Sequence, residues 1–214
     1  MKNLNITKII IVLAIGLSIS ACNNQNKNSK ELNTEPKTEM HNSNKDNHDH
    51  NGHSHNQESK STDISIKDKI NKNQATTPII DAYIQIKNGL VADDKSASAK
   101  GAENLLKAFS NFNMQNLDNK THKEYMEIYE SAKEQAEHII KSPIAHQREH
   151  FENLSTDIAD LISLLGTDKT LYSDFCPMAN NNKGAYWISE VKEIKNPYFG
   201  SKMPNCGSIK KQIN

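Results

Sequence analysis

Residues 142–166 read SPIAHQREHFENLSTDIADLISLLG, and this stretch decides the fold. Its large apolar side chains recur every three or four residues, which is the period of one face of an α-helix. They are Ile144, Phe151, Leu154, Ile158, Leu161, Ile162 and Leu165. Ser142-Pro143 provides a start signal, and Gly166 stands where a left-handed C-terminal cap belongs. A long apolar stripe of this kind predicts a helix packed against other helices.

Three stretches upstream have the same period. Thr77-Pro78 is a helix start, an N-cap followed by proline at the first helical position, and apolar residues follow it to Val91. Further helices are expected over residues 94–112 and 121–142. Four amphipathic helices predict an antiparallel bundle, and the roughly 140 residues from 76 onward are enough for one core.

The C-terminal part has a different composition. Residues 171–175 and 185–189 are expected to be short strands, joined through Asn180-Asn181-Asn182-Lys183-Gly184, which has turn chemistry. The remainder is rich in Asn, Pro and Gly. The sequence therefore predicts a mainly α protein in which an irregular C-terminal lobe with short β-strands packs against the bundle.

The first residues are typical of an exported lipoprotein. A short basic stretch precedes an apolar run over residues 9–19, which is shorter than the roughly 20 residues that a membrane-spanning helix needs. The run ends in ISAC at residues 19–22, which is similar to a lipobox. We expect residues 1–21 to be removed and Cys22 to carry diacylglycerol and fatty acyl chains such as palmitate. An ordinary secretory signal with an incidental cysteine is the alternative.

Residues 22–75 are expected to form a disordered tether, because they contain few apolar side chains to offset chain entropy. The tether contains a histidine-rich tract, formed by His41, His48, His50, His53 and His55. Imidazoles on a flexible chain can wrap around zinc, copper or nickel, so we expect a weak accessory metal site. A polar tract without function is the alternative. The residues after Cys22 lack an acidic run, which favours a lipid anchor that faces the periplasm.

Four sulfur-containing residues of the lobe are candidate metal ligands. Cys176 and Met178 are two positions apart and share one side of an extended segment, and Met203 and Cys206 repeat the pairing in reverse order. Thiolate and thioether sulfur together favour Cu(I). Alternatively, Cys176 and Cys206 form a disulfide, which would stabilise the lobe by about 3–4 kcal/mol, or switch between the two states. The methionines are otherwise core residues.

His146 and His150 lie at i and i+4 of the fourth helix and share a face. They could supply nitrogen ligands to the sulfur site if that face meets the C-terminal lobe. A solvated helix face is the alternative. Cys176 and His150 could also form a nucleophile–base pair, but no oxyanion-stabilising motif, phosphate loop or carboxylate dyad accompanies them. We therefore do not expect an enzyme.

Several motifs resemble a known family. They are FCPM at 175–178, GAYWIS at 184–189, IKNPYFG at 194–200, the segment from Met203 to Gly207, YIQIK at 83–87 and QREHFENLS at 147–155. The chain resembles, over about residues 76–210, a periplasmic domain of unknown function common in Bacteroidetes. That domain occurs in small lipoproteins and is also appended to membrane-fusion subunits of copper/silver efflux pumps. The resemblance implies heavy-metal handling, with efflux components as partners, and brings no catalytic residues.

These features predict a membrane-anchored periplasmic protein that binds, stores or transfers copper. The alternative is a disulfide-stapled interaction module of the envelope without metal in the folded domain. The 26 basic and 26 acidic side chains balance, and loss of the two signal lysines leaves a formal charge of −2. That balance gives no electrostatic footprint for nucleic acid.

Overall fold

The computed structural model describes residues 64, 66–67 and 69–214, all within the second of two compact units of the chain, His55–Asn214. The expected signal, the expected lipid attachment site at Cys22 and the histidine-rich tract lie outside these residues. Within the described part of the chain, no helix is both long enough and apolar enough to cross a bilayer.

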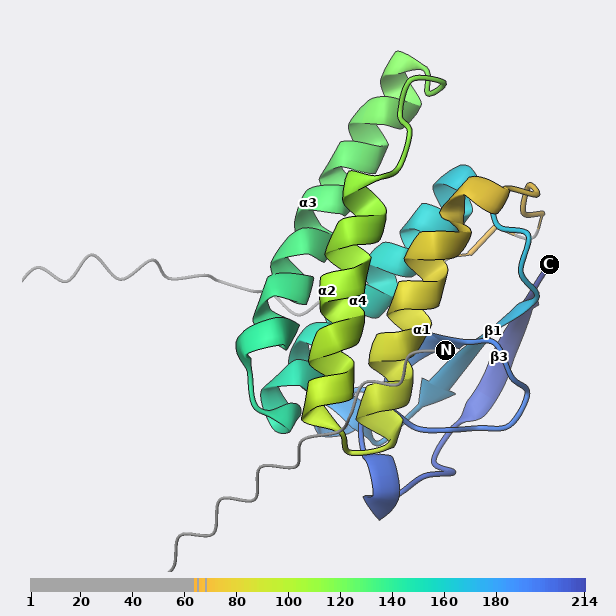
Figure 1. The fold of residues 1–214 in the computed structure, drawn as a ribbon. Coiled ribbons are helices and arrows are strands. Elements are labelled where there is room, and N and C mark those ends of the chain that lie inside the picture. The colour runs from red at the N-terminus through yellow and green to blue at the C-terminus, as the bar shows by residue number, and fades with distance from the viewer. Residues whose placement is uncertain (1–63, 65, 68) are drawn as a thin grey trace, which may run out of the picture. The chain divides into compact units, whose positions relative to one another are not determined.

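Four long helices form the bundle (Figure 1). They are α1 (Thr77–Val91), α2 (Lys95–Ser110), α3 (Asn119–Lys141) and α4 (Ile144–Leu165), and a short 3₁₀ turn, η1 (Gln74–Thr76), precedes them. Consecutive helices run antiparallel and pack side by side, and α4 also contacts α1. The prediction of a mainly α antiparallel bundle is confirmed, because each helix coincides with a stretch of helical period.

The helix ends follow local side-chain chemistry. The carboxylates of Asp94 and Asp118 cap the N-termini of α2 and α3 by accepting backbone N–H groups of the first turn. Gly166, after α4, has φ +89° and ψ −179°, which is not the left-handed cap expected from the sequence. A Cβ atom there would lie 2.1 Å from the carbonyl oxygen of Asn71, so only glycine allows this close approach.

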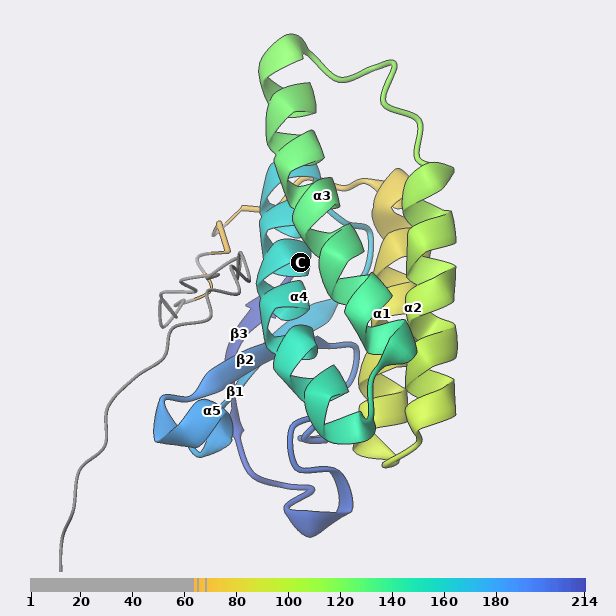
Figure 2. The same cartoon turned by 90° about the vertical axis from the view of Figure 1, so that its left-hand side faces the viewer.

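A three-stranded antiparallel sheet lies beside α4 (Figure 2). Its strands are β1 (Leu171–Cys176), β2 (Ala185–Ser189) and β3 (Ser208–Ile213), in the order β2-β1-β3. The first two were expected. The third strand was not predicted, because most of its side chains are polar and exposed. It lies at the edge of the sheet, and its pairing with β1 is what makes it a strand.

The connection from β1 to β2 has the expected turn chemistry. Asn180, Asn181 and Asn182 in the short element α5 (Ala179–Asn182) all have positive φ, between +48° and +65°. Asparagine tolerates this left-handed region better than most residues. After β2, an irregular segment with one 3₁₀ turn, η2 (Gly200–Lys202), leads to β3.

The lobe packs on the bundle through a shared hydrophobic core and through hydrogen bonds. Those made by Arg148 are called the clamp below. The backbone N–H of Ile188 in β2 donates to the hydroxyl of Tyr83 in α1, 3.0 Å away. The guanidinium of Arg148 in α4 donates to the carbonyl oxygens of Pro197 (2.8 Å) and Leu90 (2.9 Å). One side chain thereby joins α4, the end of α1 and the irregular segment of the lobe.

Candidate metal centre

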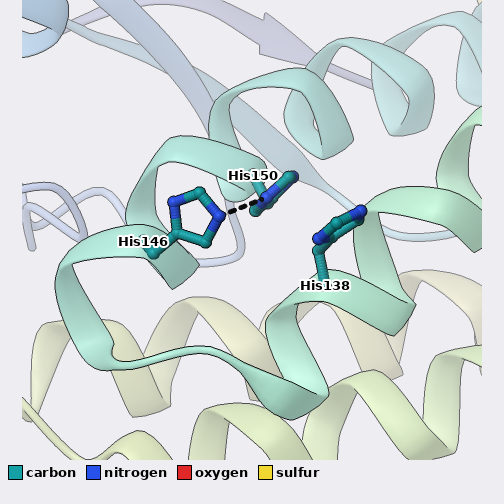
Figure 3. Close-up of side chains that lie close together, drawn as sticks. All are labelled: His138, His146 and His150. Atoms are coloured by element: carbon teal, nitrogen blue, oxygen red, sulfur yellow. Dashed lines mark hydrogen bonds between the residues drawn. The ribbon is translucent and has the colours of Figure 1, made fainter. Parts of the chain in front are cut away.

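Three imidazoles gather where α3 turns into α4 (Figure 3). His138 comes from the end of α3, and His146 and His150 come from the first two turns of α4. One ligand atom of each lies within 4.8 Å of those of the other two. Across the residues that the structure describes, this is the one such group of three or more His, Cys, Asp or Glu side chains.

The tight connection between the helices produces this arrangement. Ser142 is the C-cap of α3, with its backbone N–H donating to the carbonyl oxygen of His138, and Pro143 is the N-cap of α4. His138 lies four residues before Ser142, and His146 lies four residues after it. In an antiparallel helical hairpin such positions lie opposite one another, and His150 follows one turn later on the same face.

His146 is held by its neighbour Glu149. The Nδ1 atom of its ring lies 2.6 Å from the Oε2 atom of Glu149. A carboxylate only accepts hydrogen bonds, so the ring proton of neutral His146 is on Nδ1 and its Nε2 atom has a free lone pair.

His150 is oriented in the same way from the opposite helix. Its Nδ1 atom lies 2.8 Å from the amide oxygen of Gln135, a buried residue of α3. In neutral His150 the proton is therefore on Nδ1, and the Nε2 atom faces the Nε2 atom of His146 at 3.1 Å. This contact is a hydrogen bond when one of the two Nε2 atoms carries a proton (Figure 3), and a metal ion can take the place of that proton when both rings are neutral. Two nitrogen ligands of one tetrahedral zinc ion lie roughly 3.3 Å apart, which is close to the separation seen here.

His138 adds a third nitrogen from α3. Its ring stacks on that of His150, with centroids 4.2 Å apart and planes 12° from parallel. The ring is exposed, so a rotation of its side chain can turn a nitrogen toward the two Nε2 atoms. Three protein nitrogens leave at least one coordination position for water or an exchanging ligand.

The electrostatic surroundings favour the neutral, ligating form of His150. Burial lowers its pKa, and the adjacent His138 and His146 lower it further. A neutral imidazole needs to release no proton to bind a metal ion. Because His138 and His146 are exposed, an ion can reach this group from solvent.

The sulfur-containing residues lie elsewhere. The Sγ atoms of Cys176 and Cys206 are 2.6 Å apart, Met178 is 46% exposed, and Met203 is half-buried. His146 and His150 face α3 and not the lobe, as their contacts with His138 show. The condition set for a mixed nitrogen–sulfur site is therefore not met, and the two kinds of ligand form separate groups.

A cleft of about 600 Å³ lies between α4 and the C-terminal lobe. Its walls include Glu149 and Glu152 of α4, the exposed Met178, and Phe199 of the irregular segment. Glu149 thus borders the cleft and orients His146. The sequence analysis missed His138 because it lies on another helix. His138 and His146 are equally far from Ser142, so the assumption that the two helices form an antiparallel pair would have placed them opposite one another.

Comparison with known proteins gives one finding. Residues 79–170 match the model of a family described as "Protein of unknown function (DUF3347)". The match covers nearly all of the four-helix bundle, with the three histidines, and ends just before β1. The resemblance to a domain of unknown function is thereby confirmed for the helical part. No curated protein and no solved structure matches the chain.

Proposed function

We propose that this protein is a lipid-anchored, metal-binding protein of the periplasm that handles copper, and that its folded domain binds the ion at His138, His146 and His150. One observation carries the proposal. The Nε2 atoms of His146 and His150 lie 3.1 Å apart, their Nδ1 atoms contact Glu149 and Gln135, and a ligand atom of His138 lies within 4.8 Å of both. Such an arrangement is stabilised when a cation takes both lone pairs.

The ligand set favours a divalent ion of the later first-row transition metals. Imidazole suits copper, zinc and nickel, and Cu²⁺ binds most tightly of the series at a given site. A site of nitrogen ligands alone favours Cu(II) over the Cu(I) expected for the sulfur residues. The open coordination position and the exposed rings suit an ion that is received and passed on.

The rest of the proposal extends to the whole chain. The lipid at Cys22 would hold the protein at the membrane, and the histidine-rich tract would capture ions loosely for the folded domain. Heavy-metal efflux components are the proposed partners, in line with the resemblance to a domain that accompanies copper/silver efflux subunits. The support here is composition and resemblance.

The test is metal binding by a chain whose tract histidines are all replaced by alanine, so that only the folded domain supplies a histidine site. Titration calorimetry with Cu²⁺ and with Zn²⁺ should give one site per chain. The variants His146→Ala and His150→Ala should each weaken binding by at least about 100-fold, since even outer-shell partners are worth 10–100-fold.

His122→Ala is the matched control, because His122 is an exposed histidine of α3 outside the group. Its affinity should equal that of the parent, and circular dichroism should show the same helix content in all variants. If the His122 and His146 variants bound the metal ion with equal affinity, the proposed site at the three histidines would be excluded. Absence of binding would leave the interaction module as the function to pursue.

A further inference from the structure

The two cysteines of the lobe are brought together by the sheet. Cys176 is the last residue of β1, and Cys206 lies two residues before β3. Phe175 pairs with Ser208 at the end of the antiparallel ladder, so the two cysteines lie just beyond this pair. Their Sγ atoms are 2.6 Å apart. Regular pairing, and not a chance approach of two loops, therefore sets the contact.

The backbone beside Cys206 is fixed on both sides. The side-chain amide of the buried Asn196 donates to the carbonyl oxygen of Cys206 at 2.7 Å. Gly207 has φ +139°, and a Cβ atom there would lie 2.8 Å from the ring of Trp187 and 2.9 Å from the carbonyl oxygen of Phe175. A glycine is needed at this close approach. Cys206 is thus held in register with Cys176.

The surroundings of the sulfurs distinguish a bond from a metal site. Two thiolates on one tetrahedral zinc ion lie roughly 3.7 Å apart, well beyond the separation seen here. No third His, Cys, Asp or Glu ligand joins the pair within the described part of the chain. The contact with Cys176, followed by burial, raises the pKa of the Cys206 thiol.

We propose that Cys176 and Cys206 form a structural disulfide bond in the exported protein. Two S–H bonds of this chain break and one S–S bond forms. The two electrons and, in net balance, the two protons reduce the disulfide of an envelope thiol–disulfide oxidoreductase to two thiols. Cys206 is partly exposed and Cys176 is buried, so the mixed disulfide forms at Cys206 and Cys176 resolves it.

The bond closes the segment that carries the turn at Asn180, strand β2 and the cleft residue Phe199. Much of this segment has no regular secondary structure, so a covalent closure restricts its unfolded state strongly. The thiols are then not available to Cu(I), and metal binding at the three histidines does not depend on them.

The test uses the whole chain with Cys22→Ala, so that Cys176 and Cys206 are the only cysteines, exported and purified without reductant. The denatured protein should be lighter than its reduced form by two hydrogen atoms and should react with no maleimide, whereas reduction should release two reactive thiols. Reduction should lower Tm by about 10 °C.

The double variant Cys176→Ser, Cys206→Ser should show the same lower Tm with and without reductant, and its affinity for Cu²⁺ should equal that of the parent. Even if this variant does not fold, the mass and the thiol count of the parent show whether Cys176 and Cys206 are bonded. Two maleimide adducts without reductant, or Cu(I) bound by the exported chain and lost in the double variant, would overturn the disulfide and leave the histidine site unaffected.

Discussion

The side chains that orient the imidazoles matter as much as the imidazoles themselves. Glu149 and Gln135 each hold an Nδ1 proton, and this leaves the Nε2 atoms of His146 and His150 directed at one another. Without such partners a histidine samples both tautomers and several ring orientations. The candidate site is therefore a set of five side chains drawn from two helices.

Glu149→Ala should weaken Cu²⁺ binding by the chain without tract histidines about 10–100-fold, because His146 loses the partner that fixes its tautomer. Titration calorimetry measures this. Glu149→Gln keeps a hydrogen-bond acceptor and should bind within a few-fold of the parent. Glu130→Ala, which removes an exposed carboxylate of α3, is the control. An affinity for Glu149→Ala equal to that of Glu130→Ala would exclude the orienting role.

Asp157 in α4 is a half-buried carboxyl that should make stability depend on pH. Burial raises its pKa to about 7, against the hydrogen bond from Ser131. Between pH 4 and pH 7 the folded state therefore binds more protons than the unfolded state, so this residue lowers stability as pH rises. Asp157→Asn should be more stable than the parent by about 1–2 kcal/mol at pH 7 and no different near pH 4. Urea unfolding at both pH values measures this, and a gain of the same size at pH 4 would contradict it.

At the scale of elements, two different faces of α4 make polar contacts with different parts of the fold. One face presents His146 and His150 to α3. Another carries Arg148, which donates to carbonyl oxygens at the end of α1 and in the lobe and pairs with Asp93 at 2.5 Å. The hydrogen bonds from Ser201 and from Arg148 lower the pKa of Asp93, so the carboxylate stays charged.

Arg148→Ala should lower the free energy of unfolding by about 2–3 kcal/mol, because carbonyl oxygens at the contact between lobe and bundle lose a charged donor. Arg148→Lys should recover only part of this, since an ammonium lacks the fork that reaches several acceptors. Lys100→Ala, which removes an exposed ion pair with Glu103, should change stability by no more than about 0.5 kcal/mol. Chemical denaturation of the three variants compares them. Equal losses for Arg148→Ala and Lys100→Ala would show that the clamp contributes nothing.

At the scale of the whole molecule, the proposed division of labour assigns weak capture to the tract and tighter binding to the folded domain. The composition of residues 22–75 predicts a flexible tether with a root-mean-square reach of roughly 40 Å.

Replacing His41, His48, His50, His53 and His55 by alanine should therefore lower the number of Cu²⁺ ions bound per chain and leave the tightest Kd unchanged. Native mass spectrometry gives the stoichiometry and competition with a chelator gives the Kd. The control replaces the same number of asparagines in the tether. Loss of the tightest Kd with the tract would place the main site in the tether and not in the bundle.

The sequence by itself determined the helices and two of the strands, because the apolar period and capping residues such as Asp94 and Pro143 act over one or two turns of chain. It also singled out His146 and His150, since i and i+4 share a face of any helix. It did not predict β3, whose polar residues become a strand only by pairing with β1.

Only the tertiary structure decided which side chains meet. His138 joined His146 because α3 and α4 fold back at Ser142. The sequence had offered Cys176 and Cys206 as partners, and the pairing of β3 with β1 is what brings them into contact. The same packing turned His146 and His150 away from the sulfur residues. Local sequence fixes backbone conformation through interactions a few residues apart, whereas a site built from distant residues depends on which faces bury each other.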